Sequence, residues 1–423
     1  MRRLSLFQAA FCLLFWSAWA SAQTNWPSYI SGLEPGLSQS PIVALVPSDS
    51  VVTPPDSTVP ADKARWSGKW YGWACQSQSC DFKLVVEKVT EQGATIFYAS
   101  ASKERGRNGE RLQARFRGDE LQAALGGGQL AVRMRKSGEL EFVMDFGQGR
   151  QVGGVLSQND YTQGRLVDRI PTKFVENAKP VTLEVVIFKP AGPGPFPTVM
   201  FNHGSTGRGN NPALFNSTWT STGFAKFFTD KGWLVAFPQR RGRGKSDGLY
   251  DEGFETNRSQ YSCNPELSLP GVDHALADMD AAVEYLLARP DVDAKRMVIG
   301  GQSRGGILAV AYAGTRPQQF IGIINFVGGW LGEGCASAES INSSSFKRGS
   351  AYRNSSLWLY GENDRFYKMD HSRKNFEAFT AAGGIGAFKA FAVPAGQDGH
   401  NLIGMSDLWR ESVEAYVSQL ERK

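Results

Sequence analysis

The sequence predicts two domains, a small antiparallel β-barrel or sandwich followed by an α/β domain whose mostly parallel sheet is flanked by helices. Short apolar runs, several with period-2 alternation, are separated by Gly-containing turns over residues 64–160 and indicate the all-β domain. From residue 165 to 423, strand-like runs alternate with helical stretches, which is typical of a parallel α/β sheet. A chain of 423 residues, 41% of them hydrophobic, is long enough for both domains.

The N-terminus has the pattern of a secretory signal peptide. Arg2 and Arg3 precede an apolar run over residues 4–19, and small residues up to Ala22 suit a cleavage site. We therefore expect removal of residues 1–22 and a secreted or periplasmic protein. No later stretch approaches the ~18 uninterrupted apolar residues that a membrane span needs, so no span is expected.

Export favours disulfides, because secreted proteins fold in an oxidising compartment. Cys12 would leave with the signal peptide, and Cys75, Cys80, Cys263 and Cys335 would remain, an even number. Domain membership favours pairing the first two with each other and the last two with each other. A zinc site is set aside, because these cysteines lack a paired Cys-x-x-Cys spacing or a nearby histidine.

The first part of the mature chain divides into a linker and the all-β domain. Residues 23–63 are rich in Pro and Ser without sustained periodicity, and predict an extended linker. The Trp-rich run 66–73 resembles the first strand of lipocalin-like barrels. Its aromatic residues either fill the core or line a cup for a carbohydrate or lipid. Strand-like runs follow at 84–86, 95–98, 112–116, 130–134 and 140–144.

The second domain begins with a strand-like run near residue 180 and ends on a helix. We predict strands over 182–188, 198–201, 233–237, 320–326, 357–360 and 388–393. We predict helices over 224–231, 273–289 and 405–420, the second with apolar residues at helical spacing.

The most informative stretch is the pentad Gly301-Gln302-Ser303-Arg304-Gly305. A short apolar run over 297–299 precedes it, and a helical segment of small residues over 307–313 follows it. This strand, turn and helix context is that of a nucleophile elbow, in which glycines let strand and helix pack closely around an exposed serine. A pentad alone also fits an ordinary Gly-rich turn, so other motifs must support it.

The domain over 165–423 resembles the α/β-hydrolase fold, and within it the dienelactone-hydrolase-like branch of serine esterases. The resemblance rests on motifs in the family's order: Phe201-Asn202-His203-Gly204-Ser205, then residues 241–248, then the elbow, then Asp364 after Tyr360-Gly361-Glu362-Asn363, then Gly399-His400-Asn401. It implies a triad of Ser303, Asp364 and His400. It also implies an oxyanion hole formed by the backbone amides of Ser205 and Arg304, with Thr206 as the fallback for the first.

The residue types fit this chemistry on their own account. A serine hydroxyl needs a base within hydrogen-bond reach, and imidazole titrates in the right range. Of the four histidines, His400 follows the last strand in a Gly-rich loop, whereas His203, His274 and His371 have structural interpretations. Competing acids to Asp364 are Glu362, Asp370 and Asp398.

Substrate recognition is predicted in three inserts over residues 206–222, 246–270 and 328–353. We expect the Cys263–Cys335 bond to tie the second insert to the third as a rigid rim. Candidate pocket aromatics are Trp219, Tyr250 and Trp330, with Phe254 and Tyr261 beside them. One hypothesis is an anionic substrate drawn by the basic residues Arg240, Arg241, Arg243, Lys245 and Arg304, and the alternative is that these residues shape the loop.

Together these features predict a serine hydrolase that cleaves carboxylic esters through an acyl-enzyme, without metal or cofactor. A serine peptidase or amidase of the same fold is the first alternative. A ligand-binding protein with a relict hydrolase domain is the second. The formal charge of +5 would fall to +3 on loss of Arg2 and Arg3, and basic residues are mostly scattered, so a small-molecule substrate and not nucleic acid is the expected partner.

Overall fold

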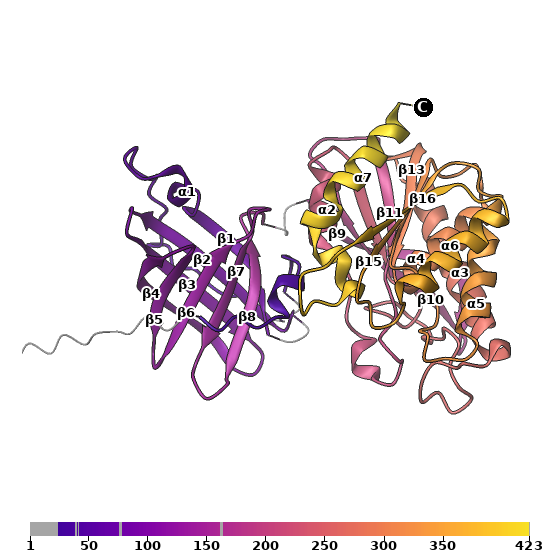
Figure 1. The fold of residues 1–423 in the computed structure, drawn as a ribbon, viewed down its shortest axis with the longest axis horizontal. Helices are drawn as coiled ribbons and strands as arrows, with labels where there is room; N and C mark the ends of the chain where they lie inside the picture. Colours follow the sequence, from indigo (N-terminus) through magenta and orange to yellow (C-terminus); the bar gives the residue numbers. More distant parts are fainter. Residues whose placement is uncertain (1–23, 39, 41, 76–77, 161–163, 423) are drawn as a thin grey trace, which may run out of the picture.

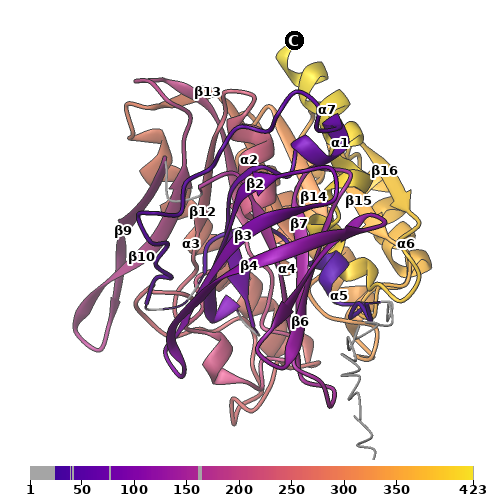
Figure 2. The ribbon, with the colours of Figure 1, turned by 90° about the vertical axis from the view of Figure 1, so that its left-hand side faces the viewer.

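The computed structural model describes residues 24–38, 40, 42–75, 78–160 and 164–422. The predicted signal peptide lies outside the described residues. Two domains lie side by side, an all-β barrel and a larger α/β domain, with a short N-terminal part of the described chain between them (Figure 1). Turned by a quarter, the barrel lies in front of the α/β domain (Figure 2). Within the described residues, no helix has the length and apolarity of a membrane span.

The first domain is a closed barrel of eight antiparallel strands, and not a sandwich. Each strand pairs with the next along the chain, and the last pairs with the first, where Tyr71 lies opposite Ser157. All five predicted strand runs lie within its strands. The strands are β1 (Gly68–Ala74), β2 (Cys80–Val89), β3 (Gly93–Ser102), β4 (Gly106–Arg117), β5 (Glu120–Leu125), β6 (Gly128–Met134), β7 (Leu140–Asp145) and β8 (Gln151–Ser157).

Aromatic side chains fill the barrel. Trp66 and Trp70 are each 2% exposed, and the rings of Phe82 and Phe142 stack with centroids 4.1 Å apart. Eight strands leave an interior that side chains alone can fill. The tryptophans Trp66 and Trp70 at the start of the barrel therefore pack in its core, which was the first of the two interpretations of the Trp-rich run.

The segment predicted as a linker, residues 24–63, lies against the barrel over much of its length. It contains the short helices η1 (Ile30–Gly32) and α1 (Ala61–Ala64). Ile30 is fully buried against Ala131 and Val143 of the barrel. The Pro and Ser content of this segment predicted an extended linker. Its few apolar side chains instead pack against the barrel.

The second domain is built on an eight-stranded sheet in the order β16-β15-β14-β13-β11-β12-β10-β9. Strands β9, β10 and β12 pair antiparallel, and the remaining pairs are parallel. The sheet is therefore mostly parallel, as predicted. Its strands are β9 (Arg165–Glu176), β10 (Lys179–Phe188), β11 (Phe196–Asn202), β12 (Leu234–Pro238), β13 (Val292–Gln302), β14 (Gly322–Phe326), β15 (Ser356–Gly361) and β16 (Gly386–Phe391).

Helices cover both faces of this sheet (Figure 1). Two of them, α2 and α7, pack together, with the rings of Phe227 and Trp409 5.5 Å apart. The helices α3 to α6 form a second group, in which each helix contacts the next along the chain. The helices are α2 (Thr222–Thr229), α3 (Pro265–Leu287), α4 (Arg304–Thr315), α5 (Ala338–Lys347), α6 (Met369–Ala381) and α7 (Ser406–Glu421), with short turns η3 (Pro212–Leu214), η4 (Arg348–Ala351) and η5 (Gly399–Gly404).

Helix α3 begins two turns before the predicted start at residue 273. The Asn264 side chain accepts a hydrogen bond from the N–H of Glu266 and caps the helix, and Pro265 occupies the first helical position. The sequence signal was obscured by Pro270, which lies inside the helix.

Candidate active site

The predicted nucleophile lies on a strained elbow at the centre of the sheet. Strand β13 ends at Gln302 and helix α4 begins at Arg304, so Ser303 alone makes the turn, with φ of 56° and ψ of −123°. Such angles are costly for a residue with a side chain and persist only where packing enforces them. A methyl group on Gly305 would lie 2.0 Å from the carbonyl oxygen of Asn202, which shows why only glycine fits beside the elbow.

The predicted acid and base are joined by a hydrogen bond. His400 Nδ1 lies 2.9 Å from Asp364 Oδ2. The other oxygen, Oδ1, accepts backbone N–H bonds from Phe366 at 2.7 Å and Tyr367 at 3.0 Å. Asp364 is 7% exposed and follows strand β15, where a loop turns it toward the histidine. Its orientation is therefore fixed from two sides.

The competing acid Asp398 has a different position. Its Oδ1 accepts the backbone N–H of His400 at 3.0 Å and caps η5, and its other oxygen pairs with Arg365. It shapes the loop that holds His400 without contacting the ring nitrogens. Glu362 and Asp370 are exposed, and neither lines the cavity described next.

Ser303, Asp364 and His400 line one cavity of about 1090 Å³. The structure places no hydrogen bond between Ser303 Oγ and His400 Nε2. The Ser303 hydroxyl instead interacts with the phenol of Tyr367, whose pKa burial raises well above its usual range. Catalytic hydrogen bonds in unliganded sites are often long and tighten only when substrate binds.

The two residues predicted to form the oxyanion hole come from different elements, Ser205 from the loop after β11 and Arg304 from the start of α4. Both line the cavity. The fallback residue Thr206 is occupied, because its N–H donates to the hydroxyl of Tyr261 at 3.2 Å. Burial, together with Arg240 and Arg243, lowers the pKa of His203 well below its usual value and keeps this loop histidine neutral.

The neutral His203 ring braces the oxyanion loop. Its Nδ1 lies 2.8 Å from the Gly204 carbonyl oxygen, and its Nε2 accepts the N–H of Arg240 at 3.1 Å. His371 lies at the start of α6, where its Nε2 is 2.9 Å from the Asn342 amide nitrogen. Both histidines are structural, as the sequence suggested. His274 is part of α3 and lines no part of the cavity.

The hypothesis of a basic pocket mouth built from residues 240–245 is wrong. Arg240 is 2% exposed and pairs with Glu252 at 2.5 Å, and Arg241 pairs with Asp278 at 2.6 Å. Arg243 packs over the ring of Tyr250. Their guanidinium groups face buried carboxylates and carbonyls behind the site, because unpaired charges are too costly to bury. Exposed Lys245 lines no part of the cavity.

Arg304 differs from the other arginines because it lines the cavity and is also buried. Its guanidinium lies between the rings of Tyr261 and Trp330, 3.6 and 4.1 Å from their centroids. Its Nη1 donates to the carbonyl oxygen of Glu252 at 2.8 Å. Burial would raise the pKa of Glu252, but Arg240 and Arg304 hold it below its usual value, so the carboxylate stays charged.

Of the five candidate pocket aromatics, Tyr261 and Trp330 line the cavity, and Trp219, Tyr250 and Phe254 do not. Trp219 packs on Phe201 and Phe237 in the core, and its N–H is held by Gln239. Tyr250 is 3% exposed and lies behind the pocket wall. Aromatic residues in an insert bind substrate or pack the insert, and sequence does not distinguish the two.

Sequence reasoning missed two aromatic members of the wall. Phe366 and Tyr367 line the cavity beside Tyr261. They directly follow Asp364, and their ring centroids lie 4.6 and 5.6 Å from that of His400. Their place immediately after the acid was the available signal.

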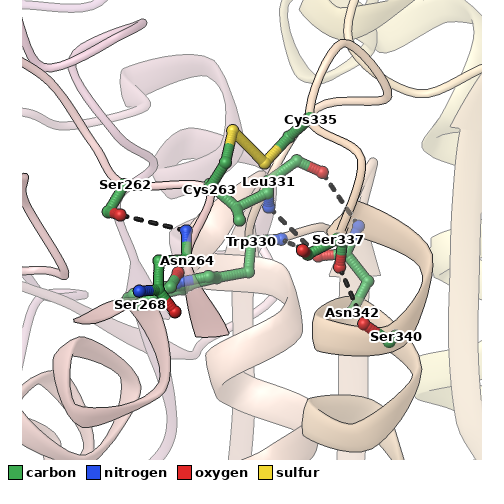
Figure 3. Close-up of a disulfide and its surroundings, with 10 residues drawn as sticks. All are labelled: Ser262, Cys263, Asn264, Ser268, Trp330, Leu331, Cys335, Ser337, Ser340 and Asn342. Atoms are coloured by element: carbon green, nitrogen blue, oxygen red, sulfur yellow. Dashed lines mark hydrogen bonds between the residues drawn. A yellow bond between two sulfur atoms is a disulfide. The ribbon is translucent and has the colours of Figure 1, made fainter. Parts of the chain in front are cut away.

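The disulfide Cys263–Cys335 joins the second insert to the third beside the cavity (Figure 3). Next to it, Trp330 donates through Nε1 to Ser268 Oγ at 2.9 Å, and its backbone N–H donates to Asn342 Oδ1, also at 2.9 Å. The predicted tie between the inserts is therefore present. The other predicted disulfide, Cys75–Cys80, joins the end of β1 to the start of β2.

One family model and several solved structures are similar to parts of this chain. Residues 214–332 match the family model of the serine aminopeptidases, S33. Esterase 2 of Thermogutta terrifontis is 17% identical over 62% of this chain and 95% of that chain, with a TM-score of 0.40. Est1E of Butyrivibrio proteoclasticus, solved with ferulic acid, is 13% identical over 60% and 100%, with a TM-score of 0.42. A puromycin-hydrolysing peptidase of Mycobacterium tuberculosis is 17% identical over 81% and 53%, with a TM-score of 0.43.

These structural likenesses are too distant to decide the class, which rests on the chain itself. The mostly parallel eight-stranded sheet, with a strand-serine-helix elbow at the end of β13, defines the second domain as an α/β hydrolase. The S33 match spans the elbow and supports a serine hydrolase within that fold. The expected resemblance is thereby confirmed at the level of the fold.

Proposed function

We propose that this protein hydrolyses carboxylic esters through an acyl-enzyme on Ser303. His400 Nε2 takes the proton of the serine hydroxyl as it attacks the ester carbonyl, and later returns it to the leaving alcohol. Asp364 accepts the Nδ1 proton, fixes the tautomer and stabilises the imidazolium. A water molecule, activated by the same histidine, then releases the acid and regenerates the serine.

The backbone amides of Ser205 and Arg304 are assigned to the oxyanion of the tetrahedral intermediates. Removing one such donor typically costs about 10²- to 10³-fold in turnover. Arg240 supports this assignment indirectly. Its Nη1 donates to the His203 carbonyl oxygen at 3.0 Å, which holds the backbone that leads to Ser205.

The single observation on which the proposal rests is the convergence of three predicted side chains. Ser303 lies on a strained elbow, His400 bonds to Asp364 at 2.9 Å, and all three line one cavity. Asp364 and His400 are 61 and 97 residues beyond the serine, so the fold brings them together. A strained turn of this kind persists where function needs it.

A fluorophosphonate probe tests the proposal. We expect covalent labelling of the wild-type protein and none of Ser303→Ala. Ser340→Ala, an exposed serine outside the cavity, is the matched control and should label fully. Equal labelling of Ser303→Ala, or no labelling of a folded wild-type protein, would contradict the assignment and favour the relict-hydrolase interpretation.

A serine peptidase or amidase is the second candidate, and the S33 match favours it. The same serine, histidine and oxyanion donors cleave amides, with the histidine protonating an amine in place of an alcohol. Chromogenic esters of graded acyl length, assayed beside aminoacyl anilides, separate the two. A higher kcat/KM for anilides than for every ester would favour the peptidase.

A ligand for the barrel is a separate proposal. One end of the barrel has a cavity of about 510 Å³, lined by Phe82, Tyr98 and Met144 with Arg105 and Asn108 among its polar members. A molecule with an apolar body and a polar head, such as a lipid, fits this lining better than a carbohydrate. Titration of the chain with a fatty acid, followed by tryptophan fluorescence, should show saturable binding that Met144→Trp abolishes.

The place of action is proposed as outside the cytoplasm, in the periplasm or the medium. Both disulfides of the described residues support this, since such bonds persist in oxidising compartments. Cell fractionation of the native host, with the N-terminus of the mature protein sequenced, tests the compartment and the cleavage after Ala22 together.

A further inference from the structure

The loop that holds His400 is partly exposed. It runs from Pro394 to Met405, between strand β16 and helix α7. On its inner side, Gln302 of the elbow donates through Nε2 to the His400 carbonyl oxygen at 3.1 Å. Its outer side faces away from the sheet and is covered by a segment from the other end of the chain.

Residues 28–36, here called the strap, cover that outer side. Gln397 donates through Nε2 to the carbonyl oxygen of Ser28. A methyl group on Gly404 would lie 2.5 Å from the carbonyl oxygen of Gly32, and one on Gly32 would lie 3.9 Å from Cβ of Asn401. The strap therefore contacts the loop both before and after His400. Figure 1 shows the indigo N-terminal segment against the yellow loop.

The barrel holds the strap from the opposite side. Arg135 of the barrel donates to two strap carbonyl oxygens, those of Ile30 at 2.9 Å and Leu33 at 2.8 Å. The Ile30 side chain is fully buried among barrel residues. Trp73 donates through Nε1 to the carbonyl oxygen of Glu34 at 2.9 Å. These contacts fix both the backbone and an apolar anchor of the strap.

The α/β domain holds the far end of the strap. Ser221 donates through Oγ to Glu34 Oε2 at 2.6 Å, and Thr222 donates to the Pro35 carbonyl oxygen. Ser221 also caps helix α2 by accepting from the N–H of Phe224. A strap bonded to the barrel, to α2 and to the histidine loop leaves the loop little room to shift relative to the elbow.

We propose that the strap positions His400, so that the barrel domain contributes to turnover by fixing the catalytic base. This inference rests on the proposed function of His400. General-base catalysis requires the imidazole within hydrogen-bond reach of the serine, and a displacement of about 1 Å typically costs on the order of 10²-fold. The strap residues touch no reacting atom and act only through the loop.

Arg135→Gln in the full-length chain tests the proposal, because it removes the hydrogen bonds from the barrel to two strap carbonyls. It also removes the pair with Glu141, which keeps its second arginine, Arg133. We expect kcat on a chromogenic ester to fall by about 10-fold with KM nearly unchanged, since the cavity wall is intact. The acidic limb of the kcat/KM profile should also shift, because the Asp364 bond to a displaced imidazole is weaker.

Arg111→Gln is the matched control. Arg111 is a barrel arginine that pairs with Glu87 at 2.8 Å and with Asp49 of the leading segment at 3.2 Å, remote from the strap residues in sequence. It should lower thermal stability to a similar extent and leave kcat and the pH profile unchanged. Equal losses of kcat in the two variants, or an unchanged kcat and pH profile in Arg135→Gln, would overturn the proposal.

A readout independent of catalysis separates this proposal from that of the hydrolase. The His400 ring nitrogens are followed by ¹⁵N NMR, assigned with His400→Ala, in wild type and Arg135→Gln. A changed titration of His400 supports the strap even if no ester is turned over, whereas an unchanged titration refutes it. If Arg135→Gln fails to fold, Gln397→Ala takes its place. This variant removes the contact between loop and strap from the loop side and should give the same change in His400 to a smaller extent.

Discussion

The Ser303 elbow and the His400 loop hold the two proton-exchanging side chains of the proposed triad, and they are stabilised in opposite ways. The elbow lies at the end of a central strand, and the Ser303 N–H donates to the Phe326 carbonyl oxygen of the neighbouring strand at 2.9 Å. A methyl group on Gly301 or Gly305 would strike backbone atoms of the elbow or of β11. The His400 loop lies beyond an edge strand and is held by Asp364, Gln302 and residues from the chain's other end.

The serine and the histidine therefore depend on different parts of the protein for their positions. The position of the serine is determined within its own domain, because the neighbouring strands and loops that contact the elbow all belong to that domain. The position of the histidine depends on a carboxylate and on a strap anchored in the barrel. Damage at the elbow should therefore appear as lost stability, and damage around the loop as lost turnover with the fold retained.

Asp364→Asn should have the largest effect, and it acts on the histidine through its Nδ1. An amide at this position donates to Nδ1 in place of accepting, so His400 adopts the wrong tautomer, and kcat should fall about 10⁴-fold while the fold is retained. Ester turnover and circular dichroism measure both. Glu362→Gln, an exposed neighbour, is the control, and an equal loss there would mean that the acid is misassigned.

Removal of the rim disulfide by Cys263→Ser with Cys335→Ser should lower the free energy of unfolding by about 4 kcal/mol. The bond closes a loop of 72 residues, and the chain-entropy model gives stabilisation of this size. Because Tyr261 and Trp330 flank the cavity, KM should rise as well. The Cys75–Cys80 bond closes only a short loop in the barrel. Its removal by Cys75→Ser with Cys80→Ser should therefore cost about 2 kcal/mol and leave KM unchanged. Denaturant unfolding distinguishes the pairs, and equal losses would contradict the prediction.

Gly305→Ala tests the elbow directly and should cost about 3 kcal/mol through overpacking. Its added methyl would lie 2.0 Å from a backbone oxygen, which cannot move without displacing strand β11. Gly334→Ala, whose methyl would meet open space at the rim, is the control and should be neutral. A Gly305→Ala protein that unfolds at the wild-type denaturant midpoint would show that the elbow tolerates strain.

The smallest expected effect concerns the pH dependence of the strap. Burial raises the pKa of Glu34 to about 7, against the opposing hydrogen bond from Ser221 and the charge of Arg135, while Glu139 adds to the rise. The unfolded chain loses this proton first as the pH rises, so stability should fall between about pH 4.5 and 7. For a half-buried side chain we expect roughly 1 to 2 kcal/mol.

Glu34→Gln removes the titration at this position. Denaturant midpoints at pH 5 and pH 8 should then converge relative to wild type, whereas barrel variants such as Arg111→Gln should retain the wild-type slope. If the wild-type and Glu34→Gln curves stay parallel over this range, the carboxyl group is already ionised in the folded protein.

Much of the fold was predictable because its elements follow local rules. The alternation in β4 marks a strand with one buried face, the apolar runs in β2, β3, β6 and β7 mark more fully buried strands, and the elbow is specified by glycines that have no steric alternative. Strand β8 escaped prediction because Gly153 and Gly154 break its pattern where a methyl group would strike neighbouring atoms. Strand β9 is largely exposed and lacks an apolar face.

The site was predictable only in part, for a physical reason. Ser303, Asp364 and His400 belong to motifs whose order along the chain is informative. Trp219 and Arg240 were misjudged because the direction in which a side chain points within a loop depends on long-range contacts, such as the pairing of Arg240 with Glu252. The strap was not foreseen, because its contacts are mostly made by backbone carbonyls that any sequence offers.

The bond between Gln397 and Ser28 joins residues 369 positions apart, which bears on how the protein is made. A chain emerging from the ribosome presents the strap long before the histidine loop, and contacts of such sequence separation form slowly because loop-closure entropy must be overcome first. The α/β domain can fold around its own sheet, but His400 reaches its catalytic position only after the strap has bound to the histidine loop. Recovery of activity should thus lag behind folding of the sheet by an interval that double-jump refolding assays can time.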